Sequence, residues 1–466
     1  MNEYVGLGEA RMIGIFGKSG AGKSWLAAYI LAGFAKNKNM GILILDPQGE
    51  FANNFPTSNL PFQQILKYAA GRELNIISSD EIRLSPENKY DVALFTKKFS
   101  EAYQLFPTTP EKYKEFLNHL YEQIVNTKPD QTQNCINPVA CYTDVMKKIN
   151  DGKIDEAARS LGLTAEELKN KLQQHSNMDD DIARQIWIKF IDSVKNILQD
   201  VFAGEDIVEK KTYYLNNKLK KREDLLKDFK AYLSLFDTSQ GKTVDDIVNL
   251  LLTQKRVIIF DLSNLGKRFS RIDDIELKAF FMNRIIGKIR EKAEQQFRAS
   301  GNNLVNVLIA MDEAHNYVGT FYSHLPEDLK QLKKQITKNV KETRKYGIGW
   351  LFITQTTVDF DKEIYRQLHD YFFLYGLGVG ADLQHMKEVV PKEFIEHYRS
   401  LPNPKQTNNY WAMHTGSLNV INTATAATFI RLPTPSEFLE LNFNMTLEEL
   451  KQKEKEMESL KDKPVD

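Results

Sequence analysis

The sequence predicts an α/β fold in which a parallel sheet is interrupted by a large all-helical insertion. Short, continuous apolar runs alternate with helical patterns in the N-terminal part and again after about residue 250. Such runs are typical of parallel strands that are covered on both faces. Residues 91–245 show almost only helical spacing. The apolar fraction of 42%, with 11% aromatic residues, is sufficient for a sizeable core.

The first strand is expected at Met12–Phe16, before a glycine-rich turn and an apolar helix over 23–34. A second strand, Gly41–Leu45, ends at Asp46. A long helix is expected over about 274–298. The later strands are expected in five apolar runs: Arg256–Asp261, Leu304–Asp312, Ile348–Thr354, Tyr371–Tyr375 and Ala426–Arg431.

The chain divides into four expected segments. They are the first part of the core (1–90), the helical insertion (91–245), the second part of the core (246–435) and a charged helical tail (436–466). Thr446 and Glu449 form a capping-box pattern at the start of the tail helix, which is expected to be exposed. The charges of the insertion are best interpreted as solvated helix faces.

Composition excludes several classes of protein. Lys and Arg number 62 and Asp and Glu number 62, which argues against a generally basic nucleic-acid binder but allows a local basic groove or pore. The two cysteines, Cys135 and Cys141, are expected to form neither a disulfide framework nor a zinc site. No apolar run reaches the roughly 18 residues of a membrane span, and the first residues lack the apolar block of a signal peptide. We therefore expect a cytoplasmic protein in a reducing compartment.

Residues 17–24, GKSGAGKS, fit the phosphate-loop pattern G-x-x-x-x-G-K-[ST] between a strand and a helix. Backbone N–H groups of the loop and the helix N-terminus attract phosphates. Lys23 is expected to neutralise the β- and γ-phosphates of ATP, and Ser24 to ligate Mg²⁺. The predicted nucleotide-binding residues are Gly17, Lys18, Ser19, Gly20, Ala21, Gly22, Lys23 and Ser24.

The run 308–313 is an apolar strand that ends in two acids, as a Walker B motif does. Asp312 is expected to hold the Mg²⁺ shell, and Glu313 to polarise the attacking water. Two carboxylates at the end of a buried strand are costly unless a cation or hydrogen bonds satisfy them. We interpret His315 as a neighbour of the site or a surface residue rather than a metal ligand, because no second His lies at ligand spacing.

Two further polar groups are expected at the same sheet edge. The segment 46–51, DPQGEF, follows the second strand and brings Asp46 and Glu50 there; a plain turn built on Pro and Gly is the alternative. Gln355 follows the strand Ile348–Thr354. Its amide is expected to sense the γ-phosphate or orient water, the alternative being a strand-end hydrogen bond.

Residues 330–345 form a basic helical stretch with seven basic side chains and one acid. Such a face is suited to DNA phosphates or to the nucleotide of a neighbouring subunit; a solvated surface is the alternative. Arg344 differs from the lysines because it lies just before Gly347 and the next strand.

Together, the phosphate loop, DPQGEF, IAMDEAHNY and ETRKYGIGWLFITQT resemble the HerA/FtsK superfamily of hexameric DNA translocases, and HerA most closely. The resemblance covers roughly 10–55 and 250–435. It implies a RecA-like P-loop NTPase sheet in which the Gln355 strand lies between the phosphate-loop strand and the Asp312 strand. It also implies a ring of six subunits with ATP and Mg²⁺ at each interface, Asp46 as a metal ligand, Glu50 at the catalytic edge, and Arg344 as an arginine finger in trans.

The resemblance implies an ATP-dependent double-stranded DNA translocase or helicase. Such a ring would act with a nuclease or other effector in DNA end processing or antiphage defence. HerA proteins usually carry an N-terminal β-barrel that docks the nuclease, and with the phosphate loop at residue 17 we expect no such barrel here. Two alternatives stay open: an ATP-binding ring that scaffolds an effector, and a DNA packaging or conjugation-type motor.

Overall fold

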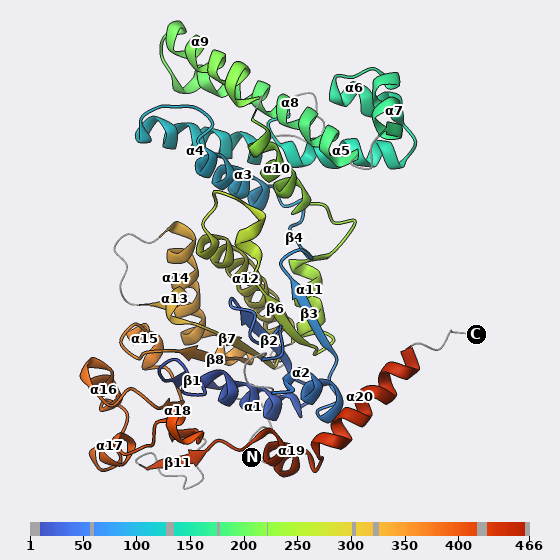
Figure 1. Ribbon diagram of the computed structural model, residues 1–466. Coiled ribbons are helices and arrows are strands. Elements are labelled where there is room, and N and C mark those ends of the chain that lie inside the picture. Colours follow the sequence, from blue (N-terminus) through green and yellow to red (C-terminus); the bar gives the residue numbers. More distant parts are fainter. Residues whose placement is uncertain are drawn as a thin grey trace. The chain divides into compact units, whose positions relative to one another are not determined.

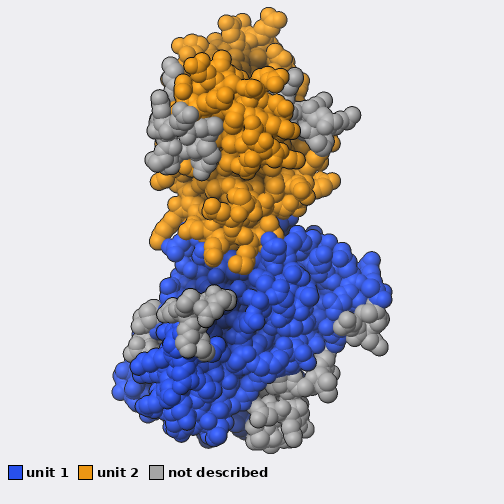
Figure 2. All heavy atoms as spheres, turned by 90° about the vertical axis from the view of Figure 1, so that its right-hand side faces the viewer, with its two compact units in different colours: residues 1–79, 245–265, 275–466 blue, residues 80–244, 266–274 orange. Residues whose placement is uncertain are grey.

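The computed structural model describes residues 10–55, 60–126, 135–174, 178–220, 222–300, 304–319, 326–416 and 426–461. The chain folds into two compact units, coloured separately in Figure 2. The first comprises residues 1–79, 245–265 and 275–466, and the second comprises 80–244 and 266–274.

The first unit is built on a sheet that has nine strands within the described residues, in the order β11-β10-β9-β1-β8-β7-β2-β6-β3. The strands are β1 Met12–Phe16, β2 Gly41–Asp46, β3 Leu74–Ser78, β6 Val257–Asp261, β7 Val307–Met311, β8 Ile348–Thr354, β9 Asp370–Leu374, β10 Trp411–Gly416 and β11 Ala427–Arg431. Neighbours pair in parallel from β9 to β3, whereas β10 runs antiparallel to both β9 and β11. The predicted α/β fold is confirmed, and β8 lies between β1 and β7 as expected.

Both faces of the sheet are buried, which explains the continuous apolar strands. Ile42 and Ile44 of β2 belong to the hydrophobic cluster that includes helix α1, Lys23–Ala35. Leu43 and Leu45 point to the opposite face, because successive side chains of a strand alternate, and they too are fully buried. Figure 1 shows α1 and the long helix α12, Asp274–Ser300, on either side of the sheet.

The remaining helices of the sheet-containing part are mostly short. They are α2 Phe62–Gln64, the π-helical turn Ile65–Ala69, α11 Val244–Leu252, α13 His315–Val318, α14 Glu327–Glu342, α15 Lys362–Tyr365, α16 Gly380–Met386, α17 Lys392–Arg399, α18 Pro404–Thr407, α19 Pro435–Phe443 and α20 Leu447–Lys461, with a 3₁₀ turn at Arg344–Tyr346. A second 3₁₀ turn, Leu265–Arg268, begins at the last residue before the chain enters the other unit. Within the described ranges, no helix combines the length and apolar character that a bilayer span requires.

The tail helix α20 begins at the predicted capping box. The Thr446 N–H donates to the Glu449 carboxylate, and the Glu449 N–H donates to the Thr446 hydroxyl. The helix is not wholly exposed, because Leu450 is buried in the hydrophobic core.

Two strands of the sheet were not predicted. In β3 only Ile77 is fully buried and Ile76 is 37% exposed, because β3 lies at the edge of the sheet. In β10 the buried positions include His414 and Thr415, so the apolar pattern is broken. Local patterning therefore finds the strands with continuous apolar runs, the edge strand β11 included, and misses β3 and β10, whose apolar patterns are broken.

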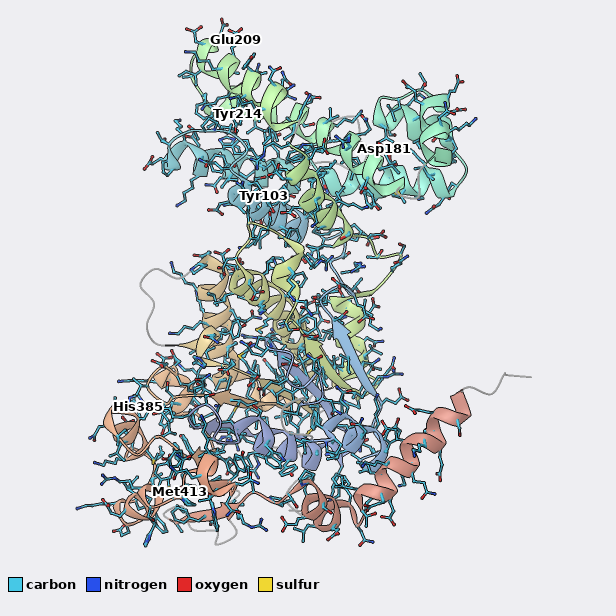
Figure 3. The ribbon with its side chains drawn as sticks, in the orientation of Figure 1. Tyr103, Asp181, Glu209, Tyr214, His385 and Met413 are labelled. Carbon is cyan, nitrogen blue, oxygen red and sulfur yellow. A yellow bond between two sulfur atoms is a disulfide. The ribbon has the colours of Figure 1, made fainter. Side chains whose placement is uncertain are left out.

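The second unit is helical. Its helices are α3 Lys89–Tyr103, α4 Pro110–Asn126, α5 Pro138–Asn150, α6 Ile154–Leu161, α7 Ala165–Gln174, α8 Met178–Val201, α9 Glu205–Tyr214, a π-helical turn Leu215–Leu219 and α10 Glu223–Ser234. Aromatic rings in edge-to-face and tilted contacts, among them Phe99, Trp187 and Phe229, fill its core. The Tyr103 hydroxyl, labelled in Figure 3, donates to the buried Asp228 carboxylate, which also accepts from the Ser270 N–H at 2.8 Å.

Two features of this unit differ from the sequence interpretation. A short parallel pair, β4 Ile82–Arg83 and β5 Lys242–Thr243, joins the two ends of the inserted chain, so the insertion is not purely helical. Cys135 and Cys141 form a disulfide, with their Cα atoms 5.8 Å apart. The expectation of no disulfide framework therefore missed this pair. The turn before α5 brings Cys135 back beside the first turn of that helix, which spacing alone does not reveal.

Candidate nucleotide site

The phosphate loop leaves the carboxyl end of β1 and is held by both neighbouring strands. The Gly17 N–H donates to the Thr354 carbonyl of β8 at 3.3 Å. The Lys18 N–H donates to the Tyr375 carbonyl, just after β9, at 3.1 Å. Gly20 and Gly22 have φ values of 80° and 93°, in the left-handed region that glycine adopts without strain. The loop backbone is thus fixed in a turn that only these glycines adopt readily.

Lys23 begins α1 and is 8% exposed. Its ammonium donates to the Lys18 carbonyl at 3.3 Å, across the inside of the loop. Burial lowers the pKa of Lys23, while the nearby Glu313, Asp312 and Glu50 carboxylates act to raise it. The first turn of α1 contains no acidic residue, so the helix N-terminus is free to attract an anion. These features suit a phosphate group.

Asp312 follows β7 and is 3% exposed. Burial raises its pKa well above the usual range, and the neighbouring carboxylates of Glu313, Asp46 and Glu50 raise it further. Such a cluster of acids favours a bound cation, which fits Mg²⁺. Within the described ranges, no three or more His, Cys, Asp or Glu residues are grouped to hold a metal by themselves. A magnesium ion would therefore be coordinated by Asp312 and Ser24 together with oxygens of the nucleotide phosphates and water.

Glu313 is held between two polar side chains. The Gln355 amide donates to both carboxylate oxygens, at 3.1 and 3.2 Å. Nδ1 of His315 lies 3.3 Å from one of these oxygens, and burial lowers the pKa of His315. Glu313 also has a φ of 47°, an uncommon backbone conformation for a non-glycine residue. The carboxylate is therefore aimed by its surroundings rather than left free.

Asp46 is fully buried at the end of β2 and organises the turn that follows it. Its two oxygens accept the N–H groups of Gly49, Glu50 and Ala52, at 2.8, 3.1 and 2.8 Å. Burial raises the pKa of Asp46 to about 7, against the effect of these hydrogen bonds. The side chain thus acts as a cap for the turn. Because a carboxylate oxygen has more than one lone pair, these hydrogen bonds do not prevent Asp46 from binding a metal as well. The role of Asp46 as a metal ligand stays a prediction.

Arg344 lies apart from the other predicted residues. It begins the 3₁₀ turn that precedes β8, whereas Gln355 follows the carboxyl end of the same strand. Because β1 and β8 are parallel, with Phe16 opposite Thr354, the phosphate loop lies at the Gln355 end. Arg344 is exposed at the opposite edge of the sheet. The structure therefore brings six of the predicted residues together at one sheet edge, and Arg344 is not among them. The six are Lys23, Asp46, Glu50, Asp312, Glu313 and Gln355.

Sequence reasoning missed several residues around the site. Lys278 of α12 donates to the Pro47 carbonyl at 3.0 Å and so supports the turn after Asp46. Lys405 and Tyr410 approach the phosphate loop so closely that a Cβ on Gly20 or Gly22 would lie 2.8 Å from them. None of these three belongs to a recognisable motif. Asp261 could have been found, because it ends the apolar run of β6 beside Asp46, as Asp46 ends β2.

A parallel sheet with this loop on β1 and acids ending the strand two places away defines a P-loop NTPase. Residues 9–289 match the family described as the central domain of helicase HerA, and the chain belongs to that family.

Solved structures offer more distant likenesses. VirB4 of Thermoanaerobacter pseudethanolicus aligns with 90% of this chain and 88% of its own, with 13% identity and a TM-score of 0.41. The genome packaging NTPase B204 from Sulfolobus turreted icosahedral virus 2, solved with sulfate, aligns with 39% of this chain and 68% of its own, with 13% identity and a TM-score of 0.25. No curated protein matches the chain significantly in sequence.

Proposed function

We propose that the protein hydrolyses ATP as a ring, most simply of six subunits, and uses the energy to move double-stranded DNA. The observation that carries this proposal is the division of the predicted residues between two edges of one sheet. The phosphate-binding and water-activating groups share the carboxyl edge, and the exposed Arg344 stands at the other. A site completed by a neighbouring subunit explains that division.

At the carboxyl edge, Lys23 would move from the Lys18 carbonyl to the β- and γ-phosphates, where its charge neutralises them. Glu313 would accept a proton from the attacking water, and Gln355 would orient that water while holding the carboxylate. A Mg²⁺ ion held by Ser24 and Asp312 would supply positive charge to the phosphoryl oxygens. Glu50 contributes negative charge that favours the cationic form of Lys23.

For DNA, helix α14 offers a row of lysines. Lys330, Lys334 and Lys338 are exposed and spaced four residues apart, so they lie along one side of the helix. Lys341 and Lys345 are exposed as well. On a chain of zero net charge, this row is suited to holding phosphates locally, as in a pore or groove.

We further propose that the ring works in the cytoplasm with a nuclease or another effector, in DNA end processing or antiphage defence. In this proposal the effector docks on a surface outside the nucleotide site. The helical unit, residues 80–244 and 266–274, is the largest structure outside the sheet and is a natural candidate.

The proposal is tested by measuring ATP hydrolysis with and without linear double-stranded DNA, and displacement of a protein block from that DNA. We expect DNA to stimulate hydrolysis and hydrolysis to drive displacement. Lys23→Ala should abolish both, because the phosphate charge is no longer neutralised. If DNA does not change the rate of ATP hydrolysis and the ring still binds an effector protein, the proposal of DNA movement is overturned and a scaffold role is favoured.

A further inference from the structure

The buried carboxylate of Asp382 joins two loops of the nucleotide site that are far apart in sequence. Asp382 lies in the first turn of α16 and is 8% exposed. One oxygen accepts the Thr357 N–H at 2.8 Å, the Thr357 hydroxyl at 3.0 Å and the Val358 N–H at 3.3 Å. The other oxygen accepts from the ammonium of Lys18 at 3.1 Å.

The first loop is the segment after Gln355. Thr357 is fully buried, and its carbonyl lies 3.1 Å from Nδ1 of His385, which is labelled in Figure 3. Only Thr356 separates Thr357 from Gln355, whose amide donates to Glu313. Because this loop is anchored to α16 on one side, its anchoring decides where the Gln355 amide stands relative to Glu313.

The second loop is the phosphate loop itself. The Lys18 side chain crosses Gly376, where a Cβ would lie 2.5 Å from Lys18 Cγ, and Gly376 has a φ of 105° that favours glycine. The side chain is 47% exposed, so its ammonium is also within reach of solvent and of incoming phosphates. Phosphates in the loop would compete with Asp382 for this ammonium, and a buried carboxylate that loses its cation becomes costly.

We propose that Asp382 is a positioning residue that couples the occupancy of the phosphate loop, through Lys18, to the placement of Gln355 against Glu313. The inference rests on the proposed ATPase function and deepens it. Because losing its cation is costly for the buried carboxylate, Asp382 follows the Lys18 ammonium when ATP phosphates attract it, and the Gln355 loop that Asp382 anchors shifts with it. The site thereby becomes competent for hydrolysis only when phosphates are present.

Two substitutions break the same contact from opposite sides. Lys18→Met keeps the length of the side chain and removes its charge, whereas Asp382→Asn keeps an acceptor for Thr357 and removes the partner of Lys18. We expect each to lower kcat roughly tenfold, and Asp382→Asn, which leaves the phosphate loop intact, to keep KM and the affinity for a fluorescent ATP analogue within about threefold. The double variant should be no slower than the slower single variant, because coupled residues are not additive.

A matched control is Lys112→Met in the helical unit. The Lys112 side chain is also 47% exposed and forms an ion pair with Glu115 at 2.7 Å. This variant should keep wild-type kcat. Thermal melting of every variant checks folding, and rates are compared well below the lowest melting temperature.

Hydrogen–deuterium exchange of residues 355–360 provides a readout that does not need turnover. ATP should change exchange there in the wild type and in Glu313→Gln, but not in Lys18→Met. The coupling would be overturned if the two substitutions lowered kcat multiplicatively in the double variant, or if ATP changed exchange in Lys18→Met as it does in the wild type. A wild type that binds ATP, shows the exchange response and never hydrolyses ATP would overturn the proposed function instead.

Discussion

Arg344→Ala is expected to leave the subunit's own nucleotide binding intact and to stop hydrolysis in the ring. β8 has seven residues, so six steps of about 3.3 Å separate its first and last residues by about 20 Å. That separation is several times the reach of an arginine side chain. Since the phosphate loop lies level with Thr354, the Arg344 guanidinium cannot serve its own nucleotide. In the proposed ring, Arg344 would therefore serve the nucleotide of a neighbouring subunit.

The size of the effect follows from the chemistry of phosphoryl transfer. An arginine finger places positive charge on the transition state and contributes about 10³ to 10⁵ in rate. We therefore expect the ATPase rate of assembled Arg344→Ala to fall by at least about 10³, with nucleotide affinity nearly unchanged. Arg344→Lys should rescue poorly, because an ammonium lacks the planar fork that contacts two phosphate oxygens. Arg298→Ala, at an exposed arginine of α12, is the matched control and should retain full activity.

Mixing two inactive chains gives the decisive assay. In rings of Lys23→Ala and Arg344→Ala subunits, a head-to-tail interface is intact when a Lys23-containing subunit meets an Arg344-containing neighbour. Random mixing at equal amounts makes about one quarter of such interfaces intact. Partial return of hydrolysis supports a site shared in trans. Two controls are required: mixed rings must be shown to form, and titrating each mutant into wild type must not inactivate the whole ring. If hydrolysis does not return under these conditions, the reasoning is refuted.

Three further predictions concern Glu313, the lysines of α14 and Asp46. Glu313→Gln should bind ATP normally and lose turnover, since the amide is nearly isosteric but accepts no proton; if single-turnover hydrolysis persists, Glu50 becomes the candidate base. DNA affinity should fall steeply with salt, and Lys334→Ala should reduce the slope of log K against log [salt] by about one, as measured by anisotropy; an unchanged slope would exclude that lysine from the interface. Asp46→Asn should flatten the dependence of stability on pH between about 4 and 7, measured by urea unfolding.

The central sheet and the acids at its carboxyl edge could be predicted because their signals are local. Ile348–Thr354 is a continuous apolar run, and the structure places β8 over the same residues. Acids that end such runs, as Asp312 does, must meet at one sheet edge when the strands are parallel. The same logic would have included Asp261, which ends the apolar run Val257–Asp261.

The residues that position the site could not be predicted, because their partners are distant in sequence. Asp382 contacts Lys18 across 364 residues, and Lys278 reaches Pro47 across 231. Each is a common residue type in an ordinary helix, with no periodicity that distinguishes it from a surface charge. The disulfide between Cys135 and Cys141 was missed for a different reason: the two residues are six apart in sequence, and their pairing depends on a turn that two cysteines alone do not specify.

Asp46 is where burial, hydrogen bonding and the proposed metal meet. Its pKa of about 7 in the folded chain lies above the usual 3.8, so the folded state holds the proton more tightly than the unfolded state. Stability should therefore fall as pH rises from about 4 to about 7, by up to about 4 kcal/mol for a shift of about three units. Asp46→Asn cannot ionise and should lack this slope. If Asp46 adjoins Mg²⁺, saturating ATP and Mg²⁺ should shrink the wild-type slope, because a cation favours the carboxylate. If ATP and Mg²⁺ leave the slope of stability against pH unchanged, Asp46 only caps its turn. If the stability of the wild type and of Asp46→Asn depends on pH in the same way, the raised pKa itself is contradicted.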